Sequence, residues 1–160
     1  MKLHKFPRSL LLLSLGITAL LLSLGITTFA QAQTLSMEVW KSPTCGCCNE
    51  WISYMQKNGF EVKVNETGNY DAYKRFNIKD GHASCHTAVI DGYVIEGHVP
   101  VEDIKRLLAE KPDAIGLSAP GMPIGSPGMD GEAYGGRKDP YDVVLIKKNG
   151  ESEVFKSYNQ

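Results

Sequence analysis

The residues with the clearest chemical potential are four cysteines, three of which lie within four positions. Cys45, Cys47 and Cys48 form the segment CGCC, and Cys85 lies far along the chain. Cys45 and Cys48 have the CxxC spacing of redox pairs and metal sites, but disulfide exchange needs no third thiol between them. A soft metal such as Cu(I) does gain a ligand from it. The spacing favours metal binding, with thiol–disulfide exchange through Cys45 and Cys48 as the alternative.

Histidine and methionine side chains could extend or cover such a site. His86 follows Cys85 directly, and His98 lies just before a predicted helix. Met122 and Met129 lie in the segment GMPIGSPGM, whose glycines and prolines exclude helix and strand. Thioether sulfur is a neutral, soft ligand that suits Cu(I). These four side chains are therefore candidates for additional metal ligands.

The number and kind of metal ions stay open at this point. Four thiolates around one Cu(I) would carry excess negative charge, which favours either more than one copper ion or a dithiol–disulfide switch that releases metal. Zinc or an iron–sulfur cluster would also use thiolates, although the loop methionines argue against zinc. A purely structural disulfide framework is disfavoured because a bridge between adjacent Cys47 and Cys48 would be strained.

The N-terminus has the pattern of a targeting segment. Lys2, Lys5 and Arg8 precede an apolar run, and a small-x-small sequence ends at Ala32. Residues 1–32 are therefore predicted to be a signal peptide, with 33–160 as the exported domain, in the periplasm or otherwise outside the cytoplasm. The apolar run contains LLLSLGIT twice and is long enough to span a bilayer, so an uncleaved anchor is the alternative.

Composition narrows the choice of partners. The 160 residues suit one domain with an apolar core, and 42% of them are hydrophobic. Removing residues 1–32 leaves 14 basic against 18 acidic residues, a net charge of −4. This balance excludes the basic footprint of a nucleic-acid-binding protein. Membrane contact is expected only through the N-terminal segment, if it is retained.

Periodicity predicts the elements that position the cysteines. Strands are expected over 37–41, 60–64, 87–90 and 93–95, and helices over 49–57, 69–76 and 100–109. Residues 115–140 are rich in glycine and proline and are predicted to form one long loop. The chain should end in a hairpin, 142–147 and 153–158, on the Asn149–Gly150 turn.

This order of elements predicts an α/β fold: a thioredoxin-like sandwich with a central mixed sheet, flanking helices, a long Gly/Pro/Met loop and a C-terminal β-hairpin. In that layout the first helix begins at the CGCC turn, and the residue before the third strand faces it. Cys85 is therefore expected beside the turn. No proline precedes the third strand, where thioredoxins carry a cis-proline, and this weakens an interpretation as a general disulfide exchanger.

Four segments together resemble the CopG-like copper-resistance proteins, a family long described as a domain of unknown function. They are the CGCC turn, Ser84–Cys85–His86–Thr87, Glu96–Gly97–His98–Val99–Pro100 and the GMPIGSPGM loop. The resemblance spans residues 37–158. It implies a small exported protein with a thioredoxin-like fold that binds copper at its cysteines, Cys45, Cys47, Cys48 and Cys85. It also implies a role in copper homeostasis, with redox change at the cluster and other exported copper-handling proteins as partners.

Overall fold

The computed structural model describes residues 34–160, and the predicted signal peptide lies outside the described residues. The strands are β1 (Leu35–Lys41), β2 (Phe60–Asn65), β3 (His86–Ile90), β4 (Tyr93–Gly97), β5 (Ala114–Ala119), β6 (Tyr141–Lys147) and β7 (Ser152–Tyr158). The α-helices are α1 (Gly46–Lys57), α2 (Tyr70–Arg75) and α3 (Val101–Glu110), and short 3-10 helices cover Asp80–His82 and Glu132–Tyr134. No helix within 34–160 is long and apolar enough to cross a membrane.

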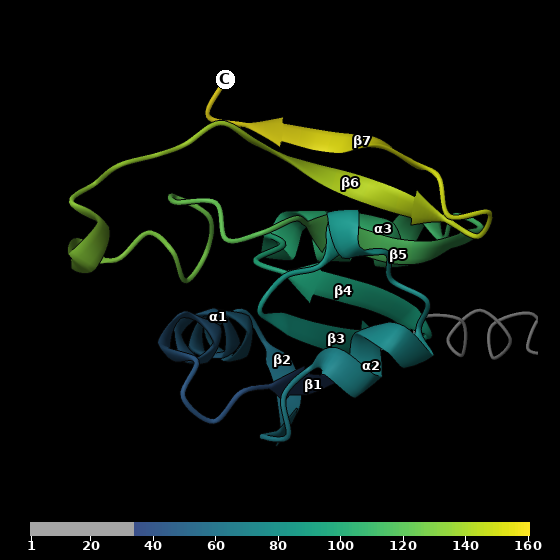
Figure 1. Ribbon diagram of the computed structural model, residues 1–160, viewed down its shortest axis with the longest axis horizontal. Helices are drawn as coiled ribbons and strands as arrows, with labels where there is room; N and C mark the ends of the chain where they lie inside the picture. Colours follow the sequence, from purple (N-terminus) through teal and green to yellow (C-terminus); the bar gives the residue numbers. More distant parts are fainter. Residues whose placement is uncertain (1–33) are drawn as a thin grey trace, which may run out of the picture. The chain divides into compact units, whose positions relative to one another are not determined.

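All seven strands form one mixed sheet in the order β2-β1-β3-β4-β5-β6-β7 (Figure 1). β1 pairs in parallel with β2 and β4 with β5, whereas the other four pairings are antiparallel. Each parallel pair is joined through a helix, α1 and α3 respectively, because parallel neighbours need a crossover connection. The predicted α/β architecture with a central mixed sheet and flanking helices is confirmed, and the C-terminal hairpin is its β6–β7 pair.

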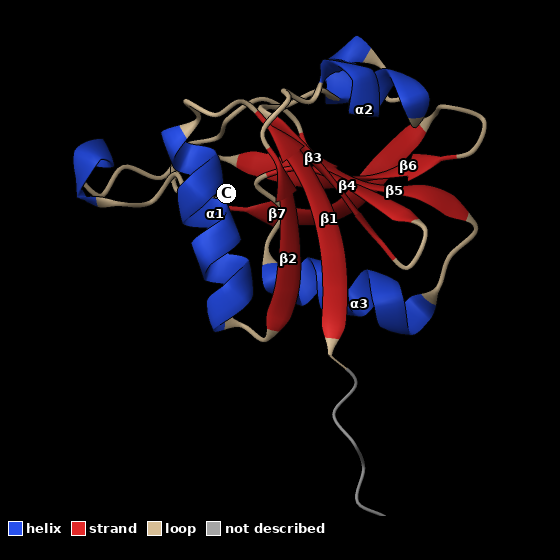
Figure 2. Ribbon diagram, turned by 90° about the horizontal axis from the view of Figure 1, so that it is seen from below, coloured by secondary structure: helices blue, strands red, loops and turns tan. Residues whose placement is uncertain are grey.

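Helices cover both faces of the sheet (Figure 2). The apolar stripe of α1, which includes Trp51 and Met55, packs with Ile104 and Leu107 of α3 in the larger core on one face. On the other face, Tyr73 and Phe76 from the α2 region pack against a smaller cluster around Ile78, Val94 and Ile146. Successive side chains of a strand point to opposite faces of the sheet, and the helices on each face bury the set that points toward them.

The pairing pattern brings four chain segments to one edge of the sheet. β3 runs antiparallel to β1, with Lys41 opposite His86, so the end of β1 meets the start of β3. β4 runs antiparallel to β3 and therefore ends at the edge where β3 begins. β5 is parallel to β4 and ends there too, with Gly97 paired to Ala119. The cysteine turn, Cys85, His98 and the long loop therefore leave the sheet side by side.

The prediction of one loop over 115–140 is wrong at its start, because Ala114–Ala119 is β5. Its sequence, AIGLSA, is built mainly of small residues and contains Gly116, so it lacks the β-branched alternation that signals a strand. The predicted polar loop before Cys85 contains the 3-10 helix Asp80–His82. α1 begins at Gly46, three residues before the predicted start. The thioredoxin-like classification of this core stays a prediction.

Candidate metal centre

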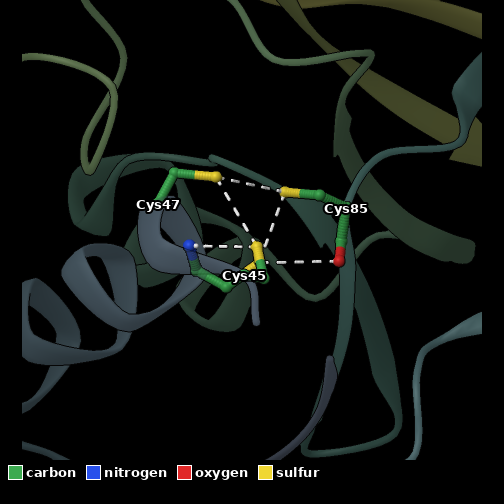
Figure 3. A group of neighbouring side chains, drawn as sticks. Cys45, Cys47 and Cys85 are labelled. Atoms are coloured by element: carbon green, nitrogen blue, oxygen red, sulfur yellow. Dashed lines mark hydrogen bonds between the residues drawn. A yellow bond between two sulfur atoms is a disulfide. The ribbon is translucent and has the colours of Figure 1, made fainter. Parts of the chain in front are cut away.

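The four cysteine sulfurs converge at the edge where β1 ends and β3 begins. Cys47 Sγ lies 3.6 Å from Cys45 Sγ and 3.9 Å from Cys85 Sγ, and Cys48 Sγ lies 3.5 Å from Cys85 Sγ. All four lie within 4.8 Å of one another. Figure 3 shows the sulfurs of Cys45, Cys47 and Cys85 pointing toward one another. The prediction that Cys85 lies beside the CGCC turn is confirmed.

The cluster is partly oxidised, since Cys45 and Cys48 form a disulfide. Cys47 and Cys85 are free thiols, and both are partly exposed. Cys48 is fully buried, so its sulfur is screened from solvent. In this form only two of the four sulfurs can become thiolates. The other two become available once the disulfide is reduced.

The first turn of α1 is organised by the sulfur of Cys45. Cys45 is the N-cap residue, with extended backbone, and its Sγ accepts a hydrogen bond from Cys48 N–H at 3.3 Å. An N-cap side chain satisfies a backbone N–H that has no partner within the helix. The helix therefore begins at Gly46, and its positive end faces Cys45 and Cys47. That field stabilises thiolates, the form in which cysteine binds metal.

Two buried histidines lie behind Cys85. His98 Nε2 is 3.1 Å from Cys85 Sγ, and His98 Nδ1 is 2.9 Å from the Pro127 carbonyl oxygen. Because a carbonyl only accepts, Nδ1 carries the proton in the neutral ring, and the Nε2 lone pair faces the thiol. His86 Nδ1 is 3.5 Å from the same sulfur, and its buried Nε2 has no partner among the described residues. Cys85, His86 and His98 form a second group with ligand atoms within 4.8 Å.

Burial keeps these groups uncharged when no metal is bound. It raises the pKa of the Cys85 thiol to about 12, and the neighbouring Cys47 adds to the rise. It lowers the pKa of His86 well below its usual value, with His98 contributing, and it also lowers the pKa of His98. Neutral imidazole is the form that binds metal, so both rings are ready to act as ligands.

The long loop closes over the cluster but places its two methionines differently. Gly121 N–H donates to the Ala83 carbonyl, which ties the loop to the segment before Cys85, and 54% of the surface of the next residue, Met122, is exposed. Further along, Gly128 packs so tightly on α1 that an added Cβ would lie 2.8 Å from the Cys47 carbonyl. Met129 is buried, and its sulfur accepts a hydrogen bond from Tyr134 at 3.2 Å. One methionine of the loop is thus buried and the other is largely exposed.

A cavity of about 400 Å³ opens beside Cys47. It lies between the first turn of α1 and the loop over 128–134, and three carboxylates, Glu50, Asp130 and Glu132, line it. These side chains give the approach to the free thiol a negative charge. A cation can therefore reach Cys47 from solvent through an attractive field.

Sequence reasoning assigned no role to two buried side chains at this site. Trp51 was placed only in the core, yet its ring contacts that of His86 in a tilted arrangement, with centroids 4.4 Å apart. Glu96 begins the segment Glu96–Pro100 that carries part of the family resemblance, but the sequence did not reveal its hydrogen bonds with Ser84 and Thr87. Burial raises the pKa of Glu96 to about 7. The sequence signal that could have revealed this role is the position of an acid in an otherwise apolar strand. An acid buried there is expected to have hydrogen-bond partners.

The donor set fits a soft metal ion. Three sulfurs come from the start of α1 and one from the segment before β3, and neutral nitrogen donors lie behind them. Thiolates and imidazoles of this kind suit Cu(I) and zinc, and the alternative use of the sulfurs is disulfide exchange. His86 Nδ1, 3.5 Å from Cys85 Sγ, and His98 Nε2, 3.1 Å from it, are the ring nitrogens that face this sulfur.

Comparison with known proteins adds an independent observation. Residues 82–129 match the model of a family described as a protein of unknown function, DUF411. Two solved structures, titled copper resistance protein CopG, form 1 and form 2, superpose with TM-scores of 0.73 at 40% identity. The match to form 1 covers 80% of this chain and 100% of the CopG chain, and the match to form 2 covers 79% and 99%. No curated protein sequence matches this chain.

Proposed function

This chain belongs to the family of the copper resistance protein CopG, and we propose that it binds Cu(I) as cargo through its four cysteines. One observation carries the proposal: four sulfurs from two separate elements lie within 4.8 Å of one another. Cu(I) prefers soft sulfur ligands, and the positive end of α1 favours the thiolate form. Bound copper would supply a charge that neutralises adjacent thiolates, and more than one ion would neutralise them more fully.

The proposed role is copper homeostasis or resistance. His86 and His98 would extend the site from behind, because both are buried against Cys85. Met122 and Met129 would cover it from the loop. The acidic cavity beside Cys47 supports entry of a cation or docking of another copper-handling protein. The N-terminal sequence supports export, and N-terminal sequencing of the protein recovered from the periplasm would test cleavage after Ala32.

Anaerobic titration of the fully reduced protein with Cu(I), against a competing chelator, tests the cysteine site. Cys85→Ser should weaken binding by more than about tenfold, since changing even a group that only touches a metal ligand costs 10- to 100-fold. Met122→Leu and Met129→Leu test whether the loop methionines contribute to the same affinity. Met55→Leu is their control, because Met55 is a core residue. Retained zinc together with indifference to copper would contradict the proposal, as would unchanged Cu(I) affinity in Cys85→Ser.

We further propose that the Cys45–Cys48 disulfide controls the capacity of the site. Its reduction by an external thiol donor consumes two electrons and two protons and yields two thiols. The reduced protein should therefore bind more Cu(I) per chain than the disulfide form, in which only Cys47 and Cys85 are thiols. Equal stoichiometry of the two forms would contradict this switch.

The same disulfide favours a second candidate function, thiol–disulfide oxidoreductase. Cys45 caps α1, and the order β2-β1-β3-β4 supports a thioredoxin-like core around it. An oxidoreductase needs only the Cys45–Cys48 pair, so turnover of a disulfide substrate would survive both Cys47→Ser and Cys85→Ser. Copper binding would be weakened by either substitution. The two variants therefore separate the candidates.

A further inference from the structure

Ser84, the residue immediately before Cys85, is fixed through all three of its polar groups. Its N–H donates to Glu96 Oε1 at 2.8 Å, and its carbonyl accepts from Asn69 Nδ2 at 3.2 Å. Its hydroxyl donates to the Gly121 carbonyl. These partners belong to β4, the start of α2 and the long loop. The backbone that leads into Cys85 is thus tied to three separate segments.

Glu96 binds the far end of the same segment as well. Its Oε2 accepts a hydrogen bond from Thr87 Oγ1 at 2.6 Å, while Oε1 holds Ser84 N–H. One buried carboxyl group therefore bonds both residues that flank the Cys85–His86 pair. Asn69 Nδ2 completes the network at 3.3 Å from Thr87 Oγ1 and 3.5 Å from Glu96 Oε1. Glu96 is wholly buried, and these bonds offset the cost of burying it.

Steric contact fixes the position of Ser84 in addition to the hydrogen bonds. Gly97 follows Glu96 with φ +73°, and a Cβ added there would overlap the Ser84 side chain and lie 2.8 Å from the Ala119 carbonyl. Ser84 therefore packs against bare backbone at the end of β4. A displacement of the Cys85 segment would have to break this packing and the Glu96 bonds together.

We propose that Glu96 is a positioning residue that holds Cys85 opposite Cys47 and Cys48. Its importance for metal binding rests on the proposed function, but the positioning itself is a property of the metal-free protein. Without the Glu96 bonds, Ser84 would keep its hydrogen bonds to Asn69 and Gly121 and its packing on Gly97, but its N–H and Thr87 would lose their shared anchor, so the Cys85 sulfur would sample a wider volume. A hydrogen bond of this kind shifts an equilibrium by roughly three- to tenfold.

The position of Cys85 can be measured without copper in a Cys45→Ser/Cys48→Ser background, where Cys47 and Cys85 are the only thiols. Equilibration with oxidised and reduced glutathione gives their effective concentration toward each other. Glu96→Ala should lower it about tenfold or more, and Thr87→Val about threefold. Glu96→Gln should stay within about twofold, because its amide oxygen still accepts from Ser84 and its amide nitrogen can donate to Thr87. Glu61→Ala, on an exposed part of β2, should change nothing.

A purely structural role would lower the thermal stability of Glu96→Ala but leave the effective concentration in the folded protein unchanged. That result would overturn the proposal. If Glu96→Ala does not fold, Thr87→Val decides: an unchanged effective concentration would overturn the proposal, and a loss would support it. A wild-type protein that fails to bind Cu(I), with Glu96 variants behaving as expected, would reject the proposed function and leave the positioning role standing.

Discussion

At the scale of single residues, the cysteine cluster depends on one sulfur that serves both structure and chemistry. Cys45 accepts the hydrogen bond that begins α1 and also forms the disulfide with Cys48. Residue types and spacing predicted the CGCC part of the cluster and a soft-metal chemistry for it, whereas the position of Cys85 was predicted from the order of the elements. The CxxC spacing also identified Cys45 and Cys48 as the candidate redox pair, and these two residues form the disulfide in the structure.

The capping role of Cys45 can be separated from its disulfide with two variants that both lack the bridge. Under reducing, metal-free conditions, Cys45→Ser keeps a side-chain acceptor for Cys48 N–H, whereas Cys45→Ala removes it. We expect Cys45→Ala to be less stable than Cys45→Ser by about 1 kcal/mol. Urea unfolding monitored by circular dichroism measures the difference. Equal stability of the two variants would show that the sulfur does not cap α1.

The polar contacts of Glu96 mark the limit of inference from sequence at this scale. β4 is buried along nearly its whole length, so its acid marks an unusual position, but the strand alone does not show which groups the carboxyl binds. Those partners follow only when β3, β4 and the start of α2 are assembled, because Ser84, Thr87 and Asn69 come from those elements. Hydrogen-bond networks between segments far apart in the chain leave no periodic pattern in the sequence. The CGCC spacing is local and can be recognised there.

At the scale of elements, the site follows from strand direction. β1 and β4 end, and β3 begins, at the same edge of the sheet, so a helix start, a cysteine and a histidine meet there. Strong periodicity predicted these strands. β5 was missed because Gly116 interrupts it, and the irregular register between Ala114 and Gly116 removes the period-two pattern. This strand matters, since its end directs the long loop over the cluster.

Gly116 is required where β5 lies against β4. A Cβ at this position would overlap the backbone carbonyl of Val94, which cannot move without breaking the pairing. We expect Gly116→Ala to destabilise the protein by about 3 kcal/mol, at the upper end of overpacking effects. Gly81→Ala is the matched control, because an added Cβ there meets nothing within 4 Å, and it should stay within about 0.5 kcal/mol. Denaturant unfolding of both variants measures the contrast, and similar values would contradict the steric argument.

At the scale of the whole described domain, a buried carboxyl group joins the C-terminal hairpin to the helical face. Tyr158 of β7 donates a hydrogen bond to Asp103 of α3 at 2.7 Å and stacks on Tyr141 of β6. Asp103 is almost fully buried, with 4% of its surface exposed. Burial raises the pKa of its carboxyl group, and the hydrogen bond from Tyr158 opposes the rise only in part. The folded protein therefore retains a proton on Asp103 at pH values where the unfolded chain has released it.

This difference makes stability depend on pH in a defined direction. Below the ordinary pKa of aspartate, about 4, both states are protonated and Asp103 has no effect. As pH rises from there through the folded-state pKa, the unfolded state binds fewer protons than the native state, so the free energy of unfolding falls. Asp103→Asn removes the titration and keeps an acceptor for Tyr158. Its stability relative to wild type should therefore increase across this range and level off above it. Urea unfolding of both proteins at closely spaced pH values measures the difference, and a difference that stays constant with pH would show that the Asp103 pKa is unchanged on folding.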